Sequence, residues 1–124
     1  MASALVRKAI TPDHFTEEAI RDPEVNALIG KIRLDELSVT DDDFLAAKVE
    51  VYRHDGEMFS EYTAAPKGDD VRNRLSKEEL VAKFMLNVRY SGTVSPAKAE
   101  RVLRLLDRLE ELDNVTELVD LLTA

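Results

Sequence analysis

The chain has 124 residues and no cysteine, and its 17 Lys+Arg against 25 Asp+Glu give a formal net charge of −8 at pH 7. This length suits one domain with a single hydrophobic core. The absence of cysteine excludes disulfides, thiolate nucleophiles and cysteine-ligated metal sites. The acidic balance disfavours binding to the phosphates of nucleic acids. No apolar run approaches the roughly 20 residues that span a bilayer. The apolar stretch near residue 1 is too short for a signal peptide. We expect a cytoplasmic protein that binds neither nucleic acid nor membrane.

Residues 1–30 are predicted to be helical. Thr11-Pro12 and Asp22-Pro23 each place a capping side chain before a proline, which suits the first position of a helix because no N–H is needed there. Gly30 is predicted to end the helix that follows Pro23.

The first ten residues carry an apolar helical face with no capping residue ahead of it; its members are Ala2, Leu5, Val6, Ala9 and Ile10. Two interpretations stay open. The segment is either a frayed first helix that docks on the core, or the trailing part of a longer helix. In the second case Leu5, Val6 and Ile10 form an apolar patch that needs a partner.

Residues 31–64 are predicted to form a small antiparallel sheet of about three strands, which makes the fold class α+β. Ile32 and Leu34 alternate with charged residues and indicate a first strand over 31–37. Two further alternating runs, 47–53 and 57–64, indicate a hairpin, with Asp55-Gly56 as a two-residue turn.

The acidic run Asp41-Asp42-Asp43 lies between these strands. It lacks the spaced oxygen ligands, the central glycine and the closing glutamate of a calcium loop. We interpret it as a solvated acidic turn and predict no metal site.

Residues 65–75 form a polar connection that contains the candidate substrate-binding residues, Lys67 and Gly68. A glycine beside a lysine lets both backbone and ammonium approach an anion. The pair lacks the full pattern of a phosphate-binding loop. The alternative is an ordinary mobile loop.

Residues 76–124 are predicted to be helical. Ser76 and Glu79 match a capping box, and the helix after them is expected to end near Ser91-Gly92. A second helix is expected from Ser95-Pro96, and Asn114 is expected to cap a last short helix. The apolar face of the second helix is expected to comprise Val102, Leu105, Leu106, Leu109 and Leu112, packed as ordinary core.

The two histidines, His14 and His54, stand alone. Neither has a serine, cysteine or second histidine nearby in the sequence, so the patterns of nucleophilic and metal catalysis find no match. We interpret both as polar residues in turns and predict no catalytic residue, no metal and no cofactor.

Four stretches, in this order, resemble the C-terminal segment of the MmgE/PrpD family, whose members include 2-methylcitrate dehydratase, cis-aconitate decarboxylase and iminodisuccinate epimerase. They are residues 10–25, residues 48–56, residues 66–69 with 75–84, and residues 109–115. The likeness covers almost the whole chain as a single domain. One departure is Arg74, which follows asparagine where the family often has proline.

The resemblance implies a C-terminal domain or small subunit of a lyase similar to 2-methylcitrate dehydratase, acting on a small polycarboxylic acid. The family's proposed catalytic residues lie upstream of this segment, so none is carried over here. The implied partners are a family polypeptide supplying that upstream part, or further copies of this chain. The alternative is a non-enzymatic module that associates through Leu5, Val6 and Ile10. Whether the chain acts as an enzyme by itself stays open.

Overall fold

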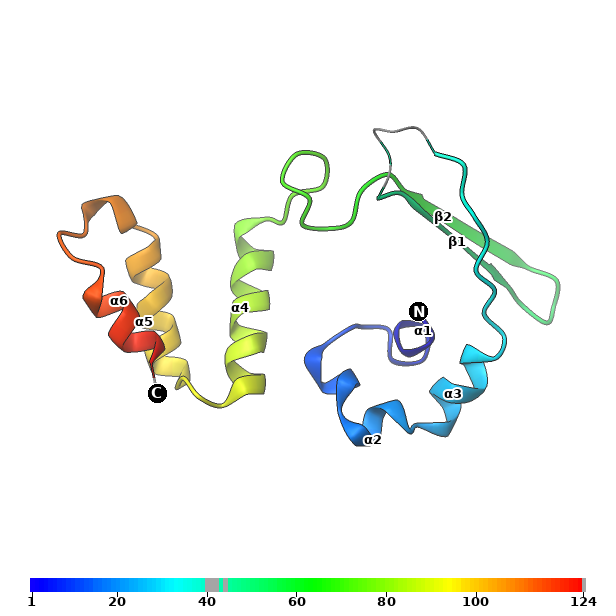
Figure 1. The fold of residues 1–124 in the computed structure, drawn as a ribbon, viewed down its shortest axis with the longest axis horizontal. Helices are drawn as coiled ribbons and strands as arrows, with labels where there is room; N and C mark the ends of the chain where they lie inside the picture. The colour runs from blue at the N-terminus through cyan, green and yellow to red at the C-terminus, as the bar shows by residue number, and fades with distance from the viewer. Residues whose placement is uncertain (40–42, 44, 124) are drawn as a thin grey trace. The chain divides into compact units, whose positions relative to one another are not determined.

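The computed structural model describes residues 1–39, 43 and 45–123 (Figure 1). Its elements are α1 (Ala2–Arg7), the 3-10 helix η1 (Pro12–Phe15), α2 (Glu17–Ile20), α3 (Pro23–Ile29), β1 (Ala47–Tyr52), β2 (Met58–Thr63), α4 (Lys77–Ser91), α5 (Pro96–Leu106), the 3-10 helix η3 (Leu109–Glu111) and α6 (Thr116–Leu122). The predicted α+β class is confirmed. The chain divides into two compact units, a helical unit (1–32 with 78–124) and a hairpin unit (33–77).

Two amino-terminal helices begin where the Thr11-Pro12 and Asp22-Pro23 pairs predicted. η1 follows Thr11, whose backbone N–H donates to Nδ1 of His14 at 3.3 Å. α3 follows Asp22, whose carboxylate accepts from the backbone N–H of Glu24 at 2.9 Å. α1 has no side-chain cap, as expected, and ends at Lys8 in a left-handed conformation with φ of 55°. The predicted apolar face is therefore shorter than expected, because Ala9 and Ile10 lie beyond the helix.

The carboxy-terminal helices form a small core. Val88 of α4, Val94 of the connection and Ala99 of α5 are buried together, and Phe84 and Met85 pack against them. α4 ends at Ser91-Gly92 as predicted, with Gly92 at φ of 65° and its N–H donating to the carbonyl of Val88.

α5 begins at Pro96 as predicted, and the Ser95 hydroxyl accepts from the N–H of Lys98. Val102 and Leu105 are buried on its inner face. The predicted extension of this face is wrong, since α5 ends at Leu106 and the chain turns through η3 before α6. Leu106 and Leu109 consequently stay 45% and 42% exposed.

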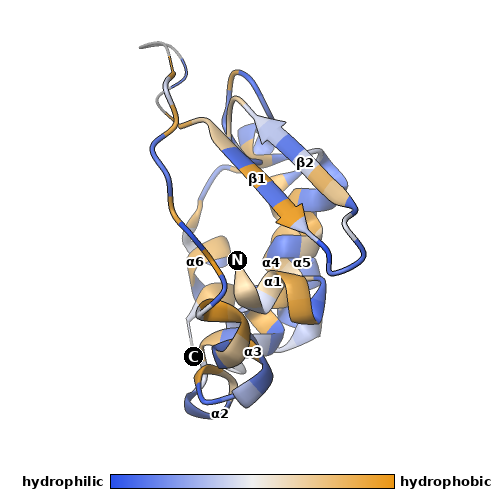
Figure 2. Cartoon of the chain, turned by 90° about the vertical axis from the view of Figure 1, so that its right-hand side faces the viewer, coloured by the Kyte–Doolittle hydropathy of each residue, from blue (hydrophilic) through white to orange (hydrophobic). Residues whose placement is uncertain are grey.

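The sheet of the hairpin unit has two strands in the described part of the chain, β1 paired antiparallel with β2. Val51 lies opposite Phe59 on one face, and Tyr52 opposite Met58 on the other. Figure 2 shows apolar and polar segments alternating along β1, as the sequence predicted. The strand expected over 31–37 is wrong, because residues 32–39 carry no regular structure. Alternation marks a potential strand, but a strand forms only where a neighbour completes its hydrogen bonds.

The hairpin turn also differs from the prediction. The N–H of Arg53 donates to the carbonyl of Glu57 and the N–H of Gly56 to the carbonyl of Arg53, so three residues, His54 to Gly56, make the loop. Gly56 has φ of 90°, whereas Asp55 keeps a negative φ. This is the three-residue hairpin loop that closes on a left-handed glycine.

Among the described residues, no helix has the length and apolar character to cross a membrane.

We expect Gly56→Ala to destabilise the hairpin by about 1–2 kcal/mol, because an L side chain in a left-handed conformation meets the following carbonyl oxygen. Hydrogen exchange of the Arg53 amide should accelerate by roughly 5- to 30-fold. The matched control is Gly30→Ala, at a helical φ of −63° with only an ordinary contact for the new Cβ, which should be neutral or stabilising by up to about 1 kcal/mol. Equal effects at the two glycines would contradict the assigned turn.

Candidate functional site

The two histidines are not brought together with catalytic partners. Nδ1 of the half-buried His14 accepts the backbone N–H of Thr11 and so completes a helix cap. His54 is exposed in the hairpin turn, and no hydrogen bond or ion pair joins it to a residue that the structure describes. Their positions therefore match polar residues in turns.

Lys67 and Gly68 lie in a loop whose polar groups bond mainly to one another. The N–H of Gly68 donates to the carbonyl of Asn73 at 2.8 Å, and the Asp69 carboxylate accepts the N–H groups of Val71 and Arg72 at 3.1 and 2.8 Å. The N–H of Gly68 is therefore engaged within the loop. A substrate contact at Lys67 and Gly68 stays a prediction.

The same backbone donors hold the pKa of the Asp69 carboxyl below its usual value, with the N–H of Arg72 as the largest cause. Asp69 also pairs with the Arg72 guanidinium, which reaches Asp43 at 3.3 Å as well. Asn73 donates from its side chain to the carbonyl of Ala65 at 3.0 Å. These bonds give the loop one defined shape without any ligand.

The predicted interface residues lie at or just beyond α1. Leu5 and Ile10 are 44% and 55% exposed, and Val6 is half-buried. The opposite side of α1 packs on α3 and buries Ala2. An apolar patch is thus present at these positions, whereas an interface through them stays a prediction.

Asp41 and Asp42 lie outside the described residues, so the interpretation of that run as a solvated turn stays a prediction. Within the described residues, no group of three or more histidine or acidic side chains is placed to hold a metal ion.

An ion pair links α1 to α3. Arg7 Nη2 lies 2.8 Å from Asp22 Oδ2, and about a quarter of each side chain is exposed. The Arg7 hydrogen bond, followed by the N–H of Glu24, holds the pKa of the Asp22 carboxyl below its usual value. Asp22 therefore caps α3 and anchors α1 with one carboxylate.

A polar ladder runs along one face of the hairpin. Lys48 Nζ lies 2.6 Å from Glu50, which also accepts from the Tyr52 hydroxyl at 2.8 Å. The Lys48 hydrogen bond lowers the pKa of Glu50, and the reciprocal bond raises that of Lys48. The Glu50 bond likewise raises the pKa of Tyr52. The ladder stabilises the charged forms of Glu50 and Lys48 and the neutral form of Tyr52 in a surface position.

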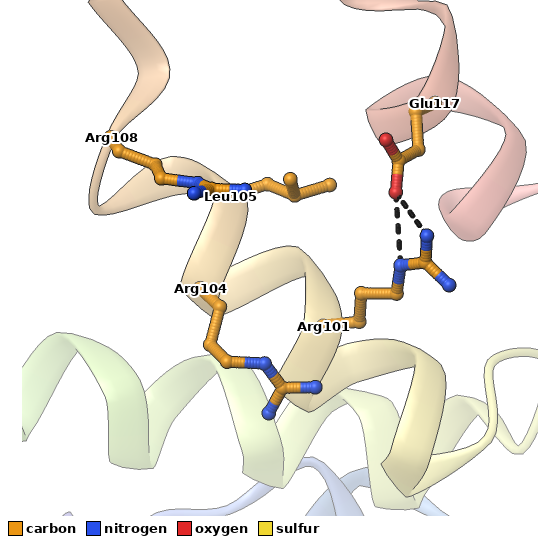
Figure 3. Close-up of a pocket in the computed structure, with 5 residues that line it drawn as sticks. All are labelled: Arg101, Arg104, Leu105, Arg108 and Glu117. Atoms are coloured by element: carbon orange, nitrogen blue, oxygen red, sulfur yellow. Dashed lines mark hydrogen bonds and ion pairs between the residues drawn. The ribbon is translucent and has the colours of Figure 1, made fainter. Parts of the chain in front are cut away.

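A cavity of about 700 Å³ lies between α5 and α6, lined by Arg101, Arg104, Leu105, Arg108 and Glu117 (Figure 3). Arg101 donates from Nε to Glu117 Oε1 at 2.9 Å, and a second nitrogen of the same guanidinium donates to that oxygen. The sequence interpretation missed this cluster, because it followed the apolar face of the helix. A partial signal was available in Arg101 and Arg104, which lie three residues apart and so share one face of α5, whereas Arg108 lies beyond the end of that helix.

Capped helices, a hairpin and a structured polar loop are thus defined. The chain belongs to the MmgE/PrpD family, since the MmgE/PrpD C-terminal domain matches residues 1–109. This confirms the resemblance to the family; the matched range contains the first three stretches and ends where the fourth, 109–115, begins. A comparison with curated proteins gave no match.

We expect an NMR titration of the Asp22 carboxyl carbon to give a midpoint below the unfolded value of about 3.9. Because the folded pKa is lowered, this carboxylate contributes stability above the unfolded pKa and loses it as the pH falls through the folded pKa. Arg7→Gln should move the midpoint upward. Arg21→Gln is the control, since Arg21 pairs with Glu17 instead, and it should leave the midpoint in place. An unchanged midpoint in Arg7→Gln would show that the ion pair is not formed in solution.

Proposed function

We propose that this chain acts as the C-terminal domain, or a separately encoded small subunit, of a cytoplasmic MmgE/PrpD-type lyase. The enzyme would resemble 2-methylcitrate dehydratase and act on a small polycarboxylic acid. The chain would be inactive alone and would work with the remaining part of the family polypeptide, or within an assembly containing further copies of itself.

The family match over residues 1–109 carries the proposal. The idea that the chain is inactive alone is supported by a second observation, that no polar or charged residue among the described ones is buried. Removing a proton from carbon beside a carboxylate requires a positioned base whose pKa lies near the working pH, and burial is a main means of tuning it. It also requires fixed donors for the developing negative charge. The described residues offer no desolvated group for the first role, so we assign proton transfer to the rest of the family polypeptide.

The 65–75 loop supports a contribution to substrate binding. A structured loop holds a cation in place at a lower entropic cost than a mobile one. We assign Lys67 to a carboxylate of the substrate, with Gly68 allowing the close approach of the chain at φ of 102°.

A second candidate function rests on the exposed apolar patch of Leu5, Val6 and Ile10. Exposed apolar patches often mark protein interfaces. The chain would then be a non-enzymatic module that keeps the fold and associates through this patch.

The lyase proposal is tested by assaying 2-methylcitrate dehydration with the chain alone, with a family polypeptide that lacks its own C-terminal domain, and with both co-expressed. We expect turnover only from the pair, because proton-transferring and anion-binding groups then come together. Turnover by the isolated chain would overturn the proposal, and so would an inactive pair of folded polypeptides.

In the active pair, Lys67→Met tests the loop assignment. We expect KM to rise by about tenfold, corresponding to the loss of one charged contact of about 1.4 kcal/mol. Lys31→Met removes an equal charge from an exposed position and serves as the control. Equal KM values for the two variants would remove Lys67 from the substrate site.

Light scattering separates the second candidate from the first. If the chain is a self-associating module, the wild type should form a stable assembly that Leu5→Asp dissolves, because burying an unpaired carboxylate is costly. Arg21→Gln makes the same change in net charge at an exposed site and should leave the assembly intact. A wild-type monomer that pairs only with the upstream polypeptide would contradict the module and favour the lyase subunit.

A further inference from the structure

The cavity between α5 and α6 concentrates positive charge in an acidic chain. Arg101, Arg104 and Arg108 lie at its wall, whereas the chain as a whole carries −8. Arg101 and Arg104 lie three residues apart on α5, and Arg108 follows just beyond the end of that helix. Like charges at this helical spacing repel by roughly 0.2–0.5 kcal/mol, and a local conflict of this kind is a feature of functional sites.

The three guanidinium groups are not equivalent. Arg101 is held by Glu117, as the two dashed bonds of Figure 3 show. No hydrogen bond or ion pair joins the guanidinium group of Arg104 or Arg108 to a residue that the structure describes. The single carboxylate at the cavity thus leaves two positive charges uncompensated.

The amino-terminal cavity of about 760 Å³ gives a useful comparison. It contains two arginines, Arg7 and Arg21, but each is paired, with Asp22 at 2.8 Å and Glu17 at 2.7 Å. Asp13 and Glu18 add further negative charge to its lining. That cavity is neutralised by its own residues, whereas the α5–α6 cavity is not.

We propose that the α5–α6 cavity binds a small oxyanion with two or more negative charges, such as a phosphoryl group or a polycarboxylate, through Arg104 and Arg108. Arginine presents a planar set of donors that matches carboxylate and phosphate oxygens in pairs. Arg101 already directs two of its nitrogens at one carboxylate oxygen, Oε1 of Glu117, at this cavity. Leu105, 5% exposed, supplies an apolar floor against which a small ligand loses water.

The size and charge of the site favour a small ligand over a polymeric one. A cavity of about 700 Å³ lies within the range that small molecules occupy. The −8 net charge repels an extended polyanion, while a small anion experiences mainly the two nearby cations.

The test is a calorimetric titration of the 124-residue chain with inorganic phosphate and, separately, citrate, at constant ionic strength, with acetate as the monovalent comparison. We expect the divalent and trivalent anions to bind and acetate not to bind measurably. The double variant Arg104→Gln/Arg108→Gln should weaken binding at least tenfold. Arg21→Gln should leave it unchanged.

Glu117→Gln provides a prediction of opposite sign. Removing the one carboxylate at the cavity releases Arg101 and should strengthen anion binding several-fold. If the glutamine double variant fails to fold, Arg104→Lys/Arg108→Lys keeps the charge and loses the paired donors, and it should weaken binding by an intermediate factor.

Equal affinity of wild type and the glutamine double variant would overturn the proposal. Binding of an acidic peptide without binding of either small anion would overturn it too, because the site would then be a protein contact. Tighter binding of phosphate would indicate a phosphoryl ligand, and tighter binding of citrate would indicate a polycarboxylate. Since no turnover is measured, the result is independent of the lyase proposal.

Discussion

The structure depends on one constraint: the side chains that it buries are small. Among the described residues, the buried core consists of alanines and valines with a single leucine, Leu105, and Val102 is the largest fully buried side chain. Burial of a valine or leucine side chain stabilises the fold by about 1.5–3 kcal/mol. Each helix buries only a few such side chains, so its stabilisation from packing is small. Helix caps and the Arg7–Asp22 pair consequently carry more of the local order than they would in a domain with an aromatic core.

The same constraint leaves the large apolar side chains at the surface. Phe15 is 71% exposed, and Phe59, on the face of the hairpin that also carries Val51, is 51% exposed. A two-stranded sheet by itself is marginally stable in water. The exposed apolar surface of these elements is the surface on which the proposal of a partner depends.

The sequence predicted those features that are determined locally. The starts of α3 and α5 follow from Asp22-Pro23 and Ser95-Pro96, because a cap and a proline act within one helical turn. The prediction of a strand over 31–37 was wrong, because a strand needs a partner to complete its hydrogen bonds. The prediction that Leu109 is buried was wrong, because it required α5 to continue past Leu106. Arg7 and Asp22 are 15 positions apart in the sequence, and Arg101 and Glu117, which meet at the α5–α6 cavity, are 16 positions apart. No local sequence pattern specifies contacts over such separations.

The direction of the pKa shifts indicates what kind of chemistry the surface supports. The carboxyl pKa values of Asp22, Glu50 and Asp69 are lowered, and those of Lys48 and Tyr52 are raised. A general acid or base near neutral pH needs the opposite, a raised carboxyl pKa or a lowered lysine pKa. Hydrogen bonds to exposed or half-buried partners are the first cause of each shift, and they favour the charged form of the acids and of the lysine. Such groups are suited to fixing loops, caps and anions, and a proton-transferring group of this family's chemistry has to be sought outside them.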